Sequence, residues 1–228
     1  MNTNKTFANP PKINLLTMLR LGLFQMGLSM MSILTLGVLN RVMIQELTIP
    51  ATIVAVLVAI PFFVAPARIW FGQLSDTQKL FGSYRTGYVL LGAIVFAGAA
   101  FIAVQMMWQL GDAVQTEGGI GGLLSIGWMV LLALTFIVYG LAMSASATAF
   151  MALLVDISEE ESRSKLVGIV WSLLMVGVII GAILSGSLLN QLTANSTIDF
   201  LQSSVNRLFV VVPALVLGLA FLATFCVE

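Results

Sequence analysis

The sequence contains no histidine and only one cysteine among its 228 residues. Without histidine, imidazole cannot ligate a haem or a zinc ion, act as a general base or relay protons. A lone thiol, Cys226, excludes an internal disulfide and a thiolate metal cluster. Its simplest interpretation is a small apolar residue at a helix end. We therefore expect no metal site built from these residues.

Charge is also scarce, because Asp, Glu, Lys and Arg together make up 9% of the chain. Soluble domains carry about 25% charged residues, so the composition indicates that lipid surrounds most of this chain. Ten basic residues balance ten acidic ones, which leaves no basic face for nucleic acid. The sequence also lacks a phosphate-binding loop and a nucleophile–base pair, and we expect no enzymatic activity.

Hydrophobic residues are abundant, at 59%, and they are grouped into six long runs. A helix needs about 20 apolar residues to cross a bilayer. The pattern predicts an all-α membrane protein with six transmembrane helices in a single bundle over residues 1–228, at about 16–44, 51–71, 86–110, 126–155, 166–192 and 208–226. The longest link is the glycine-rich segment 111–125. The first run is too long for a cleaved signal peptide, and no small-residue cleavage site follows it.

The distribution of Lys and Arg predicts the orientation of these helices. With the N-terminus inside, eight basic residues fall on the cytoplasmic side: Lys5, Lys12, Arg20, Arg68, Lys79, Arg85, Arg163 and Lys165. Only Arg41 and Arg207 fall on the other side. Because cytoplasmic loops carry the excess of positive charge, both termini are expected to be cytoplasmic.

Two short charged loops lie on the predicted cytoplasmic side. The first, residues 72–85, resembles a signature between helices 2 and 3 of the major facilitator superfamily, and the second, 156–165, has an acidic-then-arginine pattern like the loop after helix 4 there. We expect a charge cluster of Asp76, Arg85, Asp156, Glu160 and Arg163 that joins helices 2–3 to helices 4–5. An ordinary solvated turn is the alternative for the first loop. The recurrence after two even-numbered helices suggests two three-helix repeats.

Small and polar residues within the spans indicate helix contacts or a cavity. Gly177, Gly181 and Ser185 recur at four-residue spacing, which lets another helix approach closely. In helix 1, one arc of about 80° at 100° per residue holds Gln25, Ser29, Ser32 and Asn40. This stripe could line a polar cavity or bond to neighbouring helices, since unpaired polar groups are costly in hydrocarbon.

Arg41 lies close to the outer end of helix 1, five residues before Glu46. A charge near the membrane boundary commonly anchors a helix by extending toward the headgroups. A buried ion pair between Arg41 and Glu46 is the alternative. In helix 4, Ser144 and Ser146 belong to a small-residue stretch that a flat ring could approach.

Four segments carry a resemblance to a known family, namely residues 19–51, 66–76, 139–156 and 159–177. They resemble the PucC/LhaA family of photosynthetic membrane proteins, and helix 4 looks most similar to its cyanobacterial branch. The resemblance implies a major facilitator fold of twelve helices, of which this chain would be the N-terminal half. A C-terminal half or a partner chain would then complete the protein.

The same resemblance implies a function. The family is associated with assembly of light-harvesting complexes, so chlorophyll, antenna or photosystem subunits and membrane lipid are the expected partners, in a thylakoid or bacterial inner membrane. Because the chain offers no imidazole, a chlorophyll magnesium would need Gln25, Asn40, Gln105, a backbone carbonyl or water as its ligand. A solute transporter of the same fold and a purely structural membrane subunit are the alternatives.

Overall fold

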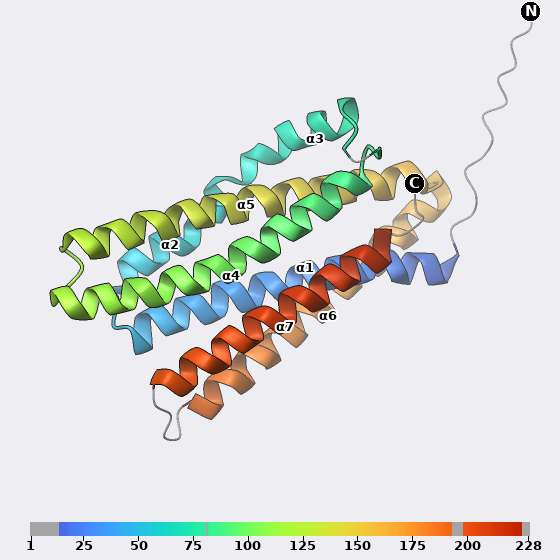
Figure 1. Ribbon diagram of the computed structural model, residues 1–228. Coiled ribbons are helices and arrows are strands. Elements are labelled where there is room, and N and C mark those ends of the chain that lie inside the picture. Colours follow the sequence, from blue (N-terminus) through green and yellow to red (C-terminus); the bar gives the residue numbers. More distant parts are fainter. Residues whose placement is uncertain (1–13, 81, 193–197, 225–228) are drawn as a thin grey trace, which may run out of the picture.

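The computed structural model describes residues 14–80, 82–192 and 198–224. Within these residues, six helical spans are long and apolar enough to cross a membrane, as predicted. The described residues contain no strand beyond an isolated bridge between Leu80 and Ser83. The chain is therefore an all-α integral membrane protein (Figure 1).

The first two spans both depart from regular α-helix. The first comprises α1 (Leu15–Arg41) and a π-helical turn, η1 (Val42–Glu46). The second consists of α2 (Ala51–Phe63), a 3₁₀ turn η2 (Ala65–Ala67) and α3 (Arg68–Thr77), so the predicted single helix at 51–71 is too short and is broken. Proline explains the break, because it removes a backbone N–H and its ring clashes with the preceding turn.

The third and fourth spans, α4 (Thr86–Glu117) and α5 (Leu123–Ile157), are longer than predicted. The glycine-rich loop shrinks to residues 118–122. Gly118 ends α4 with a φ of 68°, a left-handed conformation that favours glycine. The Glu117 carboxylate then accepts the backbone N–H groups of Leu124 and Ser125, at 3.0 and 2.8 Å. These bonds satisfy donors that the first turn of α5 leaves unpaired.

The last two spans are α6 (Glu160–Leu192) and α7 (Ile198–Thr224). The predicted loop at 156–165 is wrong in extent, because only Ser158 and Glu159 separate α5 from α6. Acidic residues in the first turn of α6 are favoured by the positive end of the helix dipole. α7 begins well before residue 208, and the predicted end of this span at 225–226 lies outside the described residues.

The helices pair in an order that relates the first three spans to the last three. α1 lies along α6, α4 lies along α5, α2 and α3 pack on α5, and α7 contacts both α1 and α4 (Figure 1). Exchanging spans 1 with 4, 2 with 5 and 3 with 6 reproduces the same set of neighbour pairs, and the pair of spans 3 and 6 maps onto itself. This is the pattern expected of two three-helix repeats.

The first and third spans are the most deeply buried in the interior. In the most hydrophobic window of the first span 56% of residues are buried, against 17% in the second. Aromatic pairs fill the centre: the ring centroids of Phe24 and Phe150 lie 4.5 Å apart, as do those of Phe96 and Tyr139. Burial of such large rings contributes much of the packing. α2 and α3 are left largely uncovered on their outer faces.

Candidate functional site

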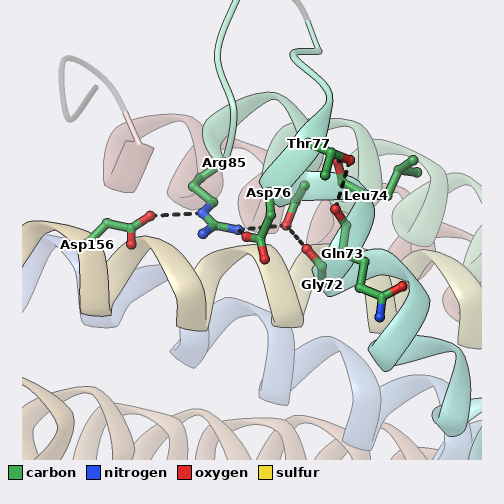
Figure 2. A network of polar contacts seen from close by, with 8 residues as sticks. Gly72, Gln73, Leu74, Asp76, Thr77, Arg85 and Asp156 are labelled. Atoms are coloured by element: carbon green, nitrogen blue, oxygen red, sulfur yellow. Dashed lines mark hydrogen bonds and ion pairs between the residues drawn. The ribbon is translucent and has the colours of Figure 1, made fainter.

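The charged residues of the two loops predicted to be cytoplasmic converge on Arg85, the residue that precedes α4. Its guanidinium forms ion pairs with Asp76 from the last turn of α3 and with Asp156 from the last turn of α5 (Figure 2). The distance from Arg85 Nε to Asp156 Oδ2 is 2.9 Å. We call Asp76, Arg85 and Asp156 the latch. It ties three helix ends together.

The electrostatics of the latch explain why its residues belong together. An acidic group in the last turn of a helix faces the negative end of the helix dipole, so Asp76 and Asp156 each need a cation. Burial of the Arg85 side chain lowers its pKa, but the hydrogen bonds to Asp156 and Asp76 more than offset this, and the net pKa is raised. Arg85 Nη1 also donates to Ser75 Oγ at 2.8 Å, and Ser75 donates to the Gly72 carbonyl.

Two of the five residues predicted for this cluster lie elsewhere. Arg163 donates to the hydroxyl and carbonyl oxygens of Ser158, at 3.3 and 3.4 Å, so it closes the turn that precedes α6. Glu160 is exposed in the first turn of α6. Within the described residues neither forms an ion pair with a latch residue, because both belong to α6 and not to the predicted loop. Ser75 was missed, although it adjoins Asp76 in the sequence.

Gly177, Gly181 and Ser185 face α1. A Cβ atom on Gly177 would overlap the carbonyl oxygen of Met26, and one on Gly181 would lie 2.9 Å from the carbonyl oxygen of Met30. Ser185 is buried and lies next to Gly37 of α1. The close contact between α1 and α6 therefore depends on small residues in α6.

Of the four serines predicted to face a cavity, Ser29 and Ser146 bond instead to a neighbouring helix. Ser29 donates to the Leu174 carbonyl of α6 at 2.9 Å. Ser32 donates to Leu28 within α1 and approaches the Met143 sulfur of α5 at 3.9 Å. Ser146 donates to the Val89 carbonyl of α4 at 2.8 Å, and Ser144 is buried. The helix 1 stripe was expected either to line a cavity or to bond to neighbouring helices. Its two serines, Ser29 and Ser32, follow the second alternative.

The C-terminal end of the first span does not continue the stripe. Asn40 is exposed. Arg41 donates from Nε to Gln45 Oε1 at 2.9 Å, while Glu46 is exposed. A buried Arg41–Glu46 pair is thus not formed, and the guanidinium bonds instead to Gln45, four residues along the helix.

Gln25 is the stripe residue that does line a cavity. The cavity has a volume of about 520 Å³ and lies between α1, α3, α5 and α6. It is lined by Gln25, Leu28, Arg68, Met143, Ala147, Thr148, Met151, Val170, Trp171 and Leu174. We call it the Gln25 cavity. The side-chain oxygen of Gln25 is buried and has no hydrogen-bond partner.

The other two side chains considered as magnesium ligands are placed less favourably. Gln105 donates to Asn206 Oδ1 at 3.0 Å and so ties α4 to α7. Asn40 is exposed outside the cavity. Gln25 is therefore the one of the three that lines this cavity, and its side-chain oxygen is buried without a hydrogen-bond partner. In the described part of the chain, no group of three or more acidic or cysteine side chains is placed to hold a metal ion.

Comparison with known proteins identifies a family. The profile of the family described as PUCC protein matches residues 38–224. Protein PucC of Rhodobacter capsulatus is 35% identical over 197 residues, which cover 85% of this chain and 41% of that protein. An uncharacterized protein in the puhA-bchM intergenic region of the same organism is 34% identical, over 81% of this chain and 38% of that protein.

A third relative has a different kind of name. Bacteriochlorophyll synthase 44.5 kDa chain of Rhodobacter capsulatus is 30% identical over 216 residues, covering 93% of this chain and 44% of that protein. The chain thus spans about two fifths of the length of the curated relatives it matches. No solved structure matches the chain.

Proposed function

Because the chain belongs to the PUCC protein family, we propose that it is part of a non-enzymatic membrane factor that assembles chlorophyll-binding light-harvesting or photosystem complexes. The observation that carries this proposal is the family match, which extends from the end of the first span to the end of the last described helix. The membrane would be a thylakoid or a bacterial inner membrane, with both chain ends on the cytoplasmic side.

The fold we propose for the whole factor is that of the major facilitator superfamily, with this chain as its N-terminal half. Two features support it: the exchange symmetry of the helix neighbours, and a charged latch that joins the ends of spans 2 and 4 to the start of span 3. A second six-helix unit, or a partner chain, would cover the face on which the Gln25 cavity opens.

Chlorophyll handling is the finer part of the proposal. Oxygen atoms are suitable ligands for magnesium, and the buried Gln25 oxygen has no partner within the protein. Gln25 would hold the pigment magnesium directly or through a water molecule, and the apolar lining contributed by α5 and α6 would accept a flat ring. When bound, chlorophyll would supply light absorption but no reaction step.

The test is purification of the tagged chain from a photosynthetic host in mild detergent, with an untagged culture as the control. We expect chlorophyll absorption and newly synthesised antenna polypeptides to co-purify, and pulse labelling to show that these polypeptides later leave. A colourless, solitary protein that moves a solute in liposomes would overturn the proposal. So would a permanent, stoichiometric place in a finished photosystem, which describes a structural subunit.

A transporter is the second candidate, and the Gln25 cavity is the observation that favours it. A cavity with a cation and a free amide oxygen at its wall could take a small solute. Catalysis has less support. One relative is named as a chain of a bacteriochlorophyll synthase, but this sequence offers no histidine and no nucleophile–base pair. Incubation of the purified chain with pigment precursors should therefore yield no new product.

A further inference from the structure

Three polar residues of the Gln25 cavity lie at one level of the bundle. Gln25 of α1, Arg68 of α3 and Trp171 of α6 are each roughly 10 residues, or about 15 Å along the axis, from the helix end nearest the latch. Three helices that are far apart in the sequence thus bring an amide, a guanidinium and an indole to one cavity. All three residues therefore lie within the candidate membrane spans and not in the loops at the latch end.

Arg68 has no counter-ion within the described residues. The ion pairs there all involve Arg85, and none of the residues that line the Gln25 cavity is acidic. Ionisable side chains at such depth usually pair with an opposite charge or a backbone carbonyl. Arg68 is exposed at the rim of the cavity, so its guanidinium is accessible to an anion from outside the protein.

Gln25, like Arg68, carries a polar group without a partner in the described part of the protein. Its side-chain oxygen is buried without a donor, although most buried polar atoms in proteins have a partner. A head group that bears a hydroxyl or N–H, or an ordered water beside it, would supply that donor. Most of the remaining lining is apolar, and it includes two methionines, Met143 and Met151, whose flexible side chains adapt to irregular ligands.

We propose that the Gln25 cavity binds an anionic amphiphile whose carboxylate or phosphate head pairs with Arg68 and whose apolar body lies along α5 and α6. This does not depend on the proposed role in complex assembly, because it rests on the charge, the free oxygen and the apolar lining alone. The ligand would enter sideways from the cytoplasmic leaflet, where anionic lipids are enriched.

A second groove on the protein shows what distinguishes this site. It lies between α4 and α5, has a volume of about 400 Å³, and is lined by Val95, Gly98, Ala99, Ile102, Met106, Leu131, Leu134, Thr135 and Val138. It contains no charged residue. It should therefore show no preference for an anionic over a neutral amphiphile.

The first experiment measures equilibrium binding of labelled oleate, and of oleyl alcohol as its neutral counterpart, to the purified chain in dodecyl maltoside. Arg68→Gln should weaken oleate binding at least tenfold, Arg68→Lys less than threefold, and the exposed control Arg207→Gln not measurably. Equal affinity of the native chain for oleate and oleyl alcohol would overturn the proposal. So would an Arg68→Gln variant that binds oleate like the control.

A measurement on the unmodified chain covers the case in which a variant misfolds. Phenylglyoxal modifies accessible arginines, and peptide mapping follows each one. Oleate should slow modification of Arg68 at least threefold and leave Arg207 unchanged, whereas oleyl alcohol should affect neither. Equal protection of both arginines, or of neither, contradicts the assigned site.

A third arm distinguishes a lipid head from a free carboxylate. The chain is placed in phosphatidylcholine nanodiscs that contain a minor fraction of phosphatidylglycerol, and bound lipids are counted by native mass spectrometry. Retention of phosphatidylglycerol that is lost in Arg68→Gln identifies a membrane lipid. Oleate binding without such retention identifies a free carboxylate, and failure of both arms overturns the proposal.

Discussion

Arg85 Nε lies 2.9 Å from Asp156 Oδ2, although the two residues are 71 positions apart in the chain. The contact fixes the start of α4 against the end of α5. Because Asp76 binds the same guanidinium, the end of α3 is fixed there as well. A single arginine thus compensates two carboxylates that each lie at the unfavourable end of a helix dipole.

Removing the arginine should therefore cost more than removing either acid. Arg85→Gln leaves two carboxylates facing each other, and we expect it to lower the free energy of unfolding by about 1–2 kcal/mol, against about 0–1 kcal/mol for Asp76→Asn or Asp156→Asn. Denaturant titration in micelles measures this. Tryptic cleavage at Lys79 should accelerate in the same order.

The matched control is Arg163→Gln, whose guanidinium bonds only within its own turn among the described residues. It should leave cleavage at Lys79 unchanged. If Arg85→Gln and Arg163→Gln had equal effects on both measurements, the latch would have no special role in closing this end of the bundle.

The approach of α6 to α1 should not tolerate a methyl group at Gly177. Its Cβ would overlap the Met26 carbonyl and the Ser29 hydroxyl, so the helices must separate. We expect Gly177→Ala to destabilise the protein by about 1–3 kcal/mol. Gly168→Ala is the control on the same helix, because a Cβ there meets nothing within 4 Å. There, the better helix propensity of alanine should leave stability unchanged or raise it by up to about 1 kcal/mol.

The hydrogen bond from Ser146 to the Val89 carbonyl should contribute measurably to the α4–α5 contact. Bonds of this kind between membrane helices average about 0.6 kcal/mol, and we expect Ser146→Ala to lose that amount. Ser172→Ala serves for comparison, since its hydroxyl bonds within α6 to Gly168 and is exposed. Thermal unfolding followed by circular dichroism would reveal the difference, and a larger loss at Ser172 would contradict this account.

Membrane orientation is tested by labelling from one side. In a Cys226→Ala background, Gln78→Cys lies at the latch end and Gly121→Cys lies in the loop at the opposite end; both positions are exposed. Because basic residues concentrate at the latch end, an impermeant maleimide should label Gly121→Cys in intact bacterial cells. Gln78→Cys should react only after lysis. The reverse pattern would mean that the excess of Lys and Arg does not orient this chain.

Hydropathy predicted the existence of all six spans but not their ends. α4 continues past residue 110 through Asp112 and Glu117, because polar residues can extend a helix beyond the lipid. It stops where Gly118 adopts positive φ, a backbone requirement that hydropathy does not measure. Likewise the break at Val64–Ala67 follows from proline stereochemistry and not from polarity.

The sequence predicted the part of the candidate site in which opposite charges lie at helix ends. It did not predict the part that depends on how the helices pack around a cavity. Asp76, Arg85 and Asp156 could be grouped from their place in two loops on one face. Arg68 could not be recognised as a site residue, because a cation near the end of a span is usually a snorkelling anchor. Only the packing of four helices shows that a cavity and an unpaired Gln25 oxygen lie beside it.

The contact between Gly140 and Pro61 has a consequence for residues far along the chain. A Cβ on Gly140 of α5 would lie 2.8 Å from the Pro61 Cα atom of α2, so α2 approaches α5 closely one turn before the break in the second span. Arg68 and Asp76 follow this contact in the same span, on α3. A bulkier residue at 140 would therefore push α2 away from α5. Because α3 continues from α2, this would also shift Asp76 of the latch and Arg68 at the cavity rim, although residue 140 contacts neither.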